Sequence, residues 1–454
     1  MSWINLISEY YGVPTMALRL LLGILLTYPI NLVFMWSSIS KSSALRQHAF
    51  FILSGMILGW WSLGLESMFH GSLSILGTYA LLKILGPSYL TTVICFIFCF
   101  GYLVVGYILT ETDTYDICWT MPHCVLTLRL IAIAFDVWDG TKPKEELGKD
   151  QLKNRLERTP SLIEMFSAVF FPASYLIGPQ FSFARYHAFI ERNSTKQAPQ
   201  PPIGRTLICL MQGFGYLFFH AIGSIYFPLD WVTSSNYINL HYGPSKVFYT
   251  FLWVKVMMSK YIGSWLLTEG SMVLSGLAYD PDASGGDPWD GGRNVRIQKW
   301  EFSGNLQDMV DSFNINTNTW AASYVYKRLR FLNNRTISSA ATLFFLSIWH
   351  GLHSGYYVTF FLEFLMLNFE RSVRDVQERF STIIGKPLRL ISGVIYIMLV
   401  LPHCFMPFGL PVWEKYWPII YHSYGMPYGF FLLWPLMASN VKSLILKFVP
   451  KKEV

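Results

Sequence analysis

Apolar stretches recur along nearly the whole chain, and their lengths constrain the fold more than any other feature. A helix needs about 20 predominantly apolar residues to cross the hydrocarbon core of a bilayer. Several stretches reach that length, whereas those at 123–135 and 161–178 are shorter and fit re-entrant or partly buried helices. We expect an all-α polytopic membrane protein with roughly nine to eleven transmembrane helices. The stretches lie at about 16–36, 49–64, 72–86, 88–110, 123–135, 161–178, 205–228, 246–277, 338–368, 388–409 and 417–440.

The composition agrees with a membrane protein and excludes a water-soluble core. Of the 454 residues, 52% are hydrophobic and only 14% are charged, and the mean hydropathy is +0.35. Soluble domains carry about 25% charged residues. The chain shows no internal repeats and no low-complexity tract, so we expect one membrane domain over residues 1–454.

The net charge of +7 has two readings. The first is the ordinary excess of Lys and Arg in cytosolic loops of membrane proteins. The second is an anionic partner, such as lipid headgroups of the bilayer or a phosphorylated co-substrate. Nothing in the sequence matches a nucleic-acid-binding module, and the six cysteines have no zinc or disulfide spacing.

The two ends of the chain indicate the compartment. Residues 1–15 lack a basic segment of the kind that opens a cleaved signal peptide. Lys451 and Lys452 stand four and three positions from the C-terminus and match the dilysine signal for retrieval to the endoplasmic reticulum. We therefore expect a multi-pass protein of that membrane, with a cytosolic tail over about residues 442–454.

Four polar segments interrupt the apolar stretches. Residues 139–159 fit a solvated loop or surface helix, 193–202 a loop and 370–389 a mixed-charge connector. Residues 280–292 form an acidic, turn-rich loop whose aspartates do not have the spacing of a calcium-binding EF-hand. Two sequons begin at Asn193 and Asn334.

Two histidines, His350 and His353, lie inside the apolar run 340–366. An ionisable side chain in hydrocarbon is expensive, so it is a functional-site hypothesis by default. Imidazole is also well suited to accept a proton near neutral pH. The competing interpretations are a structural imidazole bonded to a neighbouring helix and a His-x-x-His metal pair. The second lacks an evident third ligand, so we expect no metal.

Three polar or aromatic elements follow one another in the C-terminal third, within a catalytic segment of about residues 305–366. The first is rich in asparagine, the second is basic, and the third contains the histidine. They are Ser312-Phe313-Asn314-Ile315-Asn316-Thr317-Asn318-Thr319-Trp320, Tyr326-Lys327-Arg328-Leu329-Arg330-Phe331-Leu332 and Trp349-His350-Gly351.

The order of these elements resembles the membrane-bound O-acyltransferase family. Two earlier motifs narrow the resemblance to the lysophosphatidylcholine acyltransferases of the phospholipid-remodelling branch. They are Trp119-Thr120-Met121-Pro122-His123-Cys124-Val125-Leu126-Thr127-Leu128 and Gly178-Pro179-Gln180-Phe181-Ser182.

The resemblance implies an intramembrane chamber in which His350 and Asn314 form the catalytic pair. Asn316 and Asn318 are close enough in sequence to be alternatives to Asn314. An imidazole can take the proton of an attacking hydroxyl, and an asparagine amide can stabilise the oxyanion without adding charge to the bilayer. The co-substrate is acyl-CoA, the acceptor a lysophospholipid, and no cofactor is expected.

The residues around the histidine supply further candidates for substrate binding, with packing as the alternative for His353. They are Trp349, His353 and Tyr356, together with the cations Lys327, Arg328 and Arg330, for which plain anchoring at the membrane interface is the alternative. Lys and Arg suit the phosphates of CoA. Rival functions are acylation of a sterol, diacylglycerol or protein, and a transporter with a histidine relay. The oligomeric state is open, with a homodimer among the alternatives.

Overall fold

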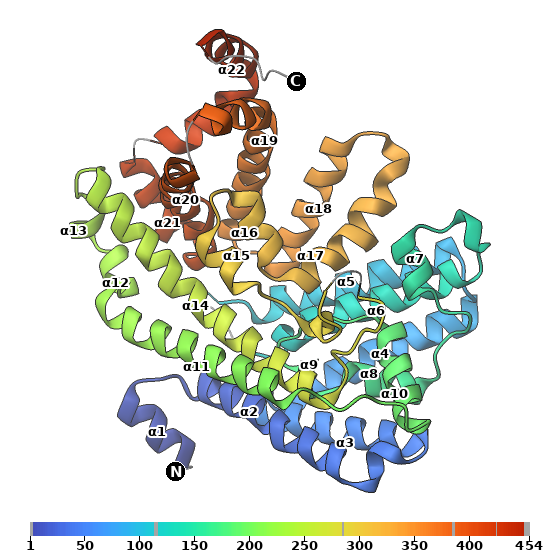
Figure 1. Cartoon of the computed structure of the whole chain (residues 1–454). Coiled ribbons are helices and arrows are strands. Elements are labelled where there is room, and N and C mark those ends of the chain that lie inside the picture. The colour runs from blue at the N-terminus through green and yellow to red at the C-terminus, as the bar shows by residue number, and fades with distance from the viewer. Residues whose placement is uncertain (1–2, 113–116, 284–285, 384–385, 424, 449–454) are drawn as a thin grey trace. The chain divides into compact units, whose positions relative to one another are not determined.

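The chain is described by a computed structural model that covers residues 3–112, 117–283, 286–383, 386–423 and 425–448 (Figure 1). These residues are almost entirely helical, and the isolated antiparallel bridge between Val295 and Phe313 is their one β-type pairing. The prediction of an all-α fold is confirmed. The dilysine signal at Lys451 and Lys452 lies outside the described residues.

The chain forms two compact units that interleave along the sequence. The first unit comprises residues 1–215, 261–294 and 315–328, and the second comprises 216–260, 295–314 and 329–454. Two long helices, α11 (Ile203–Tyr226) and α14 (Pro244–Ser275), contribute to both units. The organisation as a single membrane domain stays a prediction.

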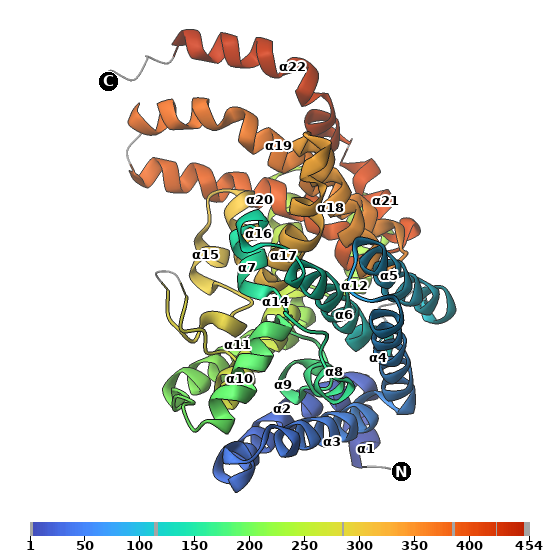
Figure 2. The same ribbon diagram turned by 90° about the vertical axis from the view of Figure 1, so that its right-hand side faces the viewer.

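The first unit contains the N-terminal helices and the short helix α17, which begins directly after Asn314. In Figures 1 and 2, α2 and α3 lie side by side, and so do α4 and α5. The bounds are α1 (Trp3–Tyr11), α2 (Thr15–Trp36), η1 (Ser38–Lys41), α3 (Ala44–Leu63), α4 (Leu65–Leu85), α5 (Tyr89–Thr110), α6 (Thr120–Gly140), η2 (Lys144–Glu146), α7 (Lys149–Asn154), α8 (Leu162–Val169), α9 (Pro172–Tyr175), α10 (Phe183–Ser194), η3 (Asp290–Gly292), α17 (Ile315–Ala321) and η4 (Ala322–Tyr326).

The second unit holds the histidine segment. Its longest helix, α19, packs along α18, α20 and α22, and Figures 1 and 2 both show these helices together. The short helix η5 (Lys327–Leu332) leads from the first unit into the second. The remaining bounds are α12 (Leu229–Val232), α13 (Ser235–Ile238), α15 (Ile297–Phe302), α16 (Leu306–Ser312), α18 (Arg335–His350), α19 (Ser354–Ile383), α20 (Lys386–Gly409), α21 (Trp413–His422) and α22 (Met426–Phe448).

Seven helices in the described part of the chain have the length and apolar composition needed to cross a membrane. This confirms a multi-pass membrane protein, while the predicted total of spans stays a prediction. The seven segments are Thr15–Trp36, Leu65–Leu85, Tyr89–Thr110, Thr120–Gly140, Ile203–Tyr226, Leu388–Gly409 and Tyr428–Lys447.

Helix α6 lies in the interior of the first unit. Its most apolar window is 89% buried, against 33% for the corresponding window of α5. A helix that is apolar on all sides buries every face. The apolar run 123–135 underestimates the length of α6, because it covers only the middle of this helix of 21 residues.

One buried arginine, Arg129 of α6, holds the chain that carries the Gly-Pro-Gln-Phe-Ser motif. Its guanidinium donates to the carbonyl oxygens of Ala168 at 2.7 Å and Val169 at 3.1 Å. It also donates to Ser174 Oγ at 2.7 Å and lies 3.9 Å from the ring centroid of Phe181. These contacts compensate the buried positive charge of Arg129, which would be costly in hydrocarbon. The Gly-Pro-Gln-Phe-Ser motif therefore belongs to the scaffold of the first unit.

Several predicted boundaries are wrong. The runs 338–368 and 417–440 are each divided between two helices. The run 161–178, in contrast, forms the short, mostly buried helices α8 and α9, as its length indicates. The mixed-charge connector 370–389 is mostly helical, because α19 continues through the described residues to Ile383. Polar residues such as Glu, Arg and Gln are good helix formers and are also common in solvated connectors, so the polarity of the segment does not separate the two.

Candidate active site

The apolar run around the histidines is broken at Gly351, so the prediction of one uninterrupted span over 340–366 is wrong. Asn334 caps the start of α18 by accepting a hydrogen bond from Ile337 N at 3.1 Å. The helix ends at His350, because Gly351 adopts φ +142°, a value that side chains with a Cβ atom rarely reach. His353 lies in the break, and α19 begins at Ser354.

His350 is the last residue of α18 and its ring is oriented by a carbonyl group. Its Nδ1 atom lies 2.7 Å from the carbonyl oxygen of Leu346, one turn earlier. A carbonyl oxygen only accepts hydrogen bonds, so the neutral imidazole carries its proton on Nδ1. Its Nε2 atom then has the lone pair that a general base needs.

Aromatic rings surround the imidazole of His350. The ring centroids of Trp349, Phe360 and Phe408 lie at 4.6, 5.0 and 5.4 Å, and that of Tyr356 lies at 6.1 Å. Except for the tyrosine hydroxyl and the indole N–H, this wall has no polar groups. The rings cover part of the half-buried imidazole, and their low polarity strengthens the electrostatic interactions made on that side.

Three predicted substrate-binding residues lie beside His350. Trp349 is buried next to it in α18, and Tyr356 is buried in the first turn of α19. The ring of His353 lies 6.2 Å from that of Tyr356. The fold thus brings Trp349, His353 and Tyr356 together around the imidazole, as the sequence indicates.

Gly355 allows the start of α19 to lie directly against the backbone of residues 407–411. Its backbone N–H donates to the carbonyl oxygen of Pro411 at 2.8 Å. A Cβ atom at Gly355 would lie 2.2 Å from the carbonyl oxygen of Pro407 and 2.7 Å from Pro411 Cα. Contact with rigid backbone leaves no room for a side chain, so this position requires glycine.

Asn314 has an unusual backbone conformation. It connects α16 to α17 with φ +48°, in the left-handed region that L residues rarely adopt and that Asn tolerates better than most. Such residues persist only where the surrounding structure holds them, and they gather at functional sites. The other two asparagines of the motif, Asn316 and Asn318, lie within α17.

Helix α20 connects the surroundings of Asn314 and His350. Phe313, which directly precedes Asn314, stacks on Trp300 at 4.8 Å and lies 6.4 Å from Phe405. Phe405 and Phe408 are three positions apart in α20, and Phe408 packs on His350. Residues three apart on a helix share a face, so one face of α20 supports both predicted catalytic segments.

The predicted basic cluster is engaged in ion pairs. Lys327 pairs with Asp150, and Arg328 makes two bonds to the carboxylate of the fully buried Asp139, one of them at 2.8 Å. The guanidinium of Arg328 also lies 4.6 Å from the ring centroid of Phe135. Arg330 is exposed. The sequence did not reveal these acidic partners, which are more than 170 residues away along the chain.

The remaining sequence candidates are structural. The ring of Trp119, the first residue of the motif 119–128, stacks on His70 at 3.8 Å, and His123 Nε2 lies 3.2 Å from Ser74 Oγ. Within the described ranges, His, Cys, Asp and Glu side chains form no group of three or more suited to a metal.

Comparison with known proteins agrees with the geometry. A family model described as MBOAT, membrane-bound O-acyltransferase family, matches residues 104–406. A Drosophila melanogaster protein named Lysophospholipid acyltransferase 5 is 35% identical over 447 residues, which cover 94% of this chain and 88% of that protein. The Homo sapiens protein of the same name is 32% identical over 460 residues, covering 99% and 93%. This chain therefore belongs to the membrane-bound O-acyltransferase family.

Proposed function

We propose that this acyltransferase moves an acyl group from acyl-CoA to the free sn-2 hydroxyl of a lysophospholipid, chiefly lysophosphatidylcholine. The observation that carries the proposal is the imidazole of His350, oriented by Leu346 and enclosed by aromatic rings. The names of the relatives in fly and human support the acceptor class. Lysophosphatidylethanolamine and lysophosphatidylserine are further acceptors under this proposal.

The reaction follows from the hydrogen-bonding pattern of His350. Its Nε2 takes the proton of the lysophospholipid hydroxyl while the hydroxyl oxygen attacks the thioester carbon. The tetrahedral intermediate collapses with cleavage of the carbon–sulfur bond, and the imidazolium returns its proton to the leaving CoA thiolate. The products are a diacyl phospholipid and free CoA, and the imidazole ends the cycle neutral.

The position of His350 favours the charged intermediate of this cycle. The imidazolium forms at the C-terminus of α18, where the unpaired carbonyl groups carry partial negative charge. The Nδ1–H bond to Leu346 is kept throughout the cycle, so the ring does not need to reorient between its two proton transfers.

Asn314 is assigned the role of stabilising the intermediate. Its amide N–H group can donate to the oxyanion or to the substrate, and removal of one such donor costs about 10²–10³-fold in rate. Asn314→Ala should accordingly be impaired more strongly than Asn316→Ala or Asn318→Ala.

The finer parts of the proposal concern chain selectivity and location. We expect polyunsaturated acyl-CoA to be preferred over saturated acyl-CoA, because a cis-polyunsaturated chain bends at little strain and enters a curved tunnel easily. A difference of about 1.4 kcal/mol in transition-state binding gives tenfold selectivity. The endoplasmic reticulum membrane, with the C-terminus in the cytosol, is the proposed location.

Release of CoA thiol from purified protein tests the proposal. Wild type should release CoA from arachidonoyl-CoA when lysophosphatidylcholine is present and far more slowly without it. A competition among arachidonoyl-, linoleoyl- and palmitoyl-CoA, with several lysophospholipids, then measures selectivity. CoA release that requires a sterol or diacylglycerol in place of a lysophospholipid would overturn the proposed acceptor. A preference for palmitoyl-CoA would overturn the proposed chain selectivity.

A further inference from the structure

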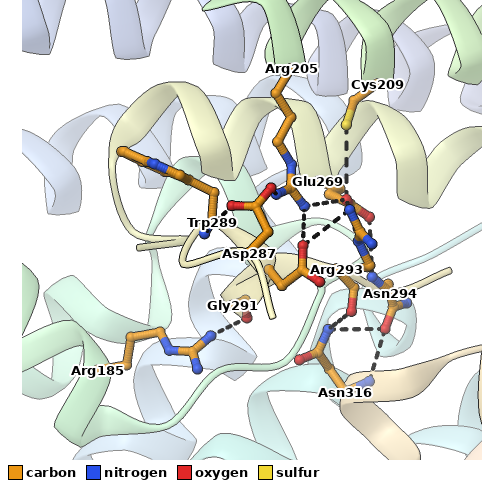
Figure 3. A network of polar contacts seen from close by, with 11 residues as sticks. Arg185, Arg205, Cys209, Glu269, Asp287, Trp289, Gly291, Arg293, Asn294 and Asn316 are labelled. Carbon is orange, nitrogen blue, oxygen red and sulfur yellow. Dashed lines mark hydrogen bonds and ion pairs between the residues drawn. The ribbon is translucent and has the colours of Figure 1, made fainter. Parts of the chain in front are cut away.

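The left-handed backbone at Asn314 must be held on both of its sides. An L residue in this region carries about 1–2 kcal/mol of unfavourable energy, less for asparagine. On the N-terminal side, Arg296 N donates to Ser312 O at 2.9 Å, and Phe313 is stacked on Trp300. On the C-terminal side, the next two residues, Ile315 and Asn316, are both bonded to Asn294. Figure 3 shows the contacts of Asn316 with Asn294.

Asn294 accepts three hydrogen bonds from these two residues. Its backbone oxygen accepts from Ile315 N at 3.1 Å. Its side-chain Oδ1 accepts from Asn316 N at 3.1 Å and from Asn316 Nδ2 at 3.2 Å. Asn294 is only 1% exposed, and removal of its side chain takes this acceptor away from both donors of Asn316.

Asn294 is itself held by a buried carboxylate. Its backbone N–H donates to Glu269 of α14 at 3.2 Å, and Glu269 is 3% exposed. Arg205 of α11 and Arg293 lie 3.5 and 3.8 Å from the other carboxylate oxygen and balance its charge. Figure 3 shows these side chains converging on Asn294 and Asn316.

The acidic loop 280–292 closes this network. Arg205 pairs with Asp287, and with Asp290 at 2.6 Å, and Arg293 pairs with Asp290 at 3.0 Å. Asp287 and Asp290 of this acidic loop therefore engage arginines. These ion pairs hold the chain that leads from the acidic loop to Asn294.

We propose that Asn294, anchored by Glu269, is a positioning residue that holds the Ile315–Asn316 backbone and thereby sets the orientation of Asn314. The proposal rests on the role assigned to Asn314 above. It also gives Asn316 a role: its amide group donates to Arg293 O at 2.9 Å and to Asn294, so it supports the backbone.

The test is a double-mutant cycle on purified protein, with product detected by mass spectrometry. Asn294→Ala should lower kcat about tenfold to a hundredfold, because misplacement of a catalytic group by about 1 Å can have that effect. The KM values for both substrates should stay near those of wild type. Asn294→Asp, which retains an acceptor oxygen at the same position, should recover most of the lost kcat.

The decisive variant is Asn294→Ala combined with Asn314→Ala. If Asn294 acts through Asn314, the double variant should have the same kcat as Asn314→Ala alone, because an absent amide cannot be misplaced. An equal loss of kcat in both backgrounds, or an unchanged kcat in Asn294→Ala, would overturn the proposal. If Asn294→Ala cannot be purified, Asn316→Ala replaces it in the cycle, because it removes the other partner of the same hydrogen bonds. The proposal is again overturned by an equal loss of kcat in both backgrounds or by an unchanged kcat in the single variant.

Asn31→Ala is the matched control. Asn31 is also fully buried, and its amide donates to Ser271 O at 3.0 Å and Ser271 Oγ at 2.9 Å. This variant should lower thermal stability while leaving kcat unchanged. If wild type acylates only an acceptor other than a lysophospholipid, the proposed function fails. The same cycle is then run with that acceptor, so that the positioning role of Asn294 is judged separately.

Discussion

The Nδ1 atom of His350 lies 2.7 Å from the carbonyl oxygen of Leu346, four residues earlier in α18. This bond places the proton of the neutral ring on Nδ1 and leaves Nε2 as the base. Gly351 ends the helix directly after the ring, so the imidazole stands at a helix terminus inside an apolar region. The catalytic assignment therefore rests on an oriented lone pair as well as on a motif.

His350→Ala should lower kcat by about 10²–10⁴-fold, the usual loss when a general base is removed. The protein should still be expressed and should still melt cooperatively. His220→Ala is a suitable control, because His220 Nδ1 also bonds to a backbone carbonyl, that of Val256 at 2.9 Å. Near-normal turnover in purified His350→Ala would remove this residue from the mechanism.

Gly355→Ala should reduce both activity and stability. The added Cβ would lie 2.2 Å from Pro407 O, and overpacking of this kind costs about 1–3 kcal/mol. A thermal melt in detergent, together with CoA release, measures the effect. Gly101→Ala is the matched control: a Cβ there meets no atom within 4 Å, so its melting temperature should stay at or slightly above that of wild type. Equal melting temperatures for the two variants would contradict this description of the site.

Arg328→Gln should destabilise the protein far more than Arg330→Gln. Arg328 pairs with Asp139, whose side chain is 0% exposed. Its loss leaves the buried carboxylate with Lys142, at 3.5 Å, and the amide of Gln151 as partners, so the cost should approach but not exceed the about 3 kcal/mol of a broken buried pair. Arg330 is exposed, so its replacement should change the melting temperature little. Similar melting temperatures in the two variants would show that Asp139 is adequately solvated without Arg328.

Lys327→Gln combined with Arg330→Gln tests for a contact with CoA phosphates while leaving Arg328 in place. The KM for acyl-CoA should rise roughly two- to fivefold, since exposed charge pairs are weak, and the KM for the lysophospholipid should change less. The effect should diminish with added salt, because the Debye length is about 8 Å at physiological ionic strength. Unchanged acyl-CoA kinetics would restrict these cations to ion pairing and membrane anchoring.

The stabilising effect of Asp280 should depend on pH. Burial by itself raises the pKa of Asp280, but the hydrogen bond from Lys153 and the charges of Arg185 and Lys153 outweigh it and hold the pKa below the ordinary value of 3.8. A lowered pKa in the folded state means that the stabilisation is fully present well above pH 3.8 and is lost as the pH falls below it.

Melting temperatures of wild type and Asp280→Asn between pH 7 and pH 3 measure this dependence. The two curves should be separated at pH 7 and should converge as the pH falls below about 4, where the carboxyl group becomes protonated. Asp282→Asn, at an exposed neighbouring position, should follow wild type throughout. A separation as large at pH 3 as at pH 7 would show that Asp280 contributes by packing rather than by charge.

Much of the architecture was predictable from local sequence. Long apolar runs indicated spanning helices because the length of a helix must match the thickness of the bilayer. The cluster of Trp349, His350, His353 and Tyr356 was also predictable, since neighbours in sequence stay close in space whatever the rest of the chain does. The helix break was missed, although Gly351 was visible, because glycine inside an apolar run is compatible with a continuous membrane helix.

The amino-acid sequence by itself determined that this chain is helical and membrane-embedded, and it indicated His350 and one of three asparagines as the residues proposed to carry the chemistry. Only the tertiary structure decided which groups support them. Phe405 and Phe408 of α20, Asn294, and Asp139 opposite Arg328 are distant in sequence from the residues they contact. Periodicity and motif spacing report only local geometry, whereas these contacts depend on how separate helices pack, and packing is set by the complementarity of whole surfaces.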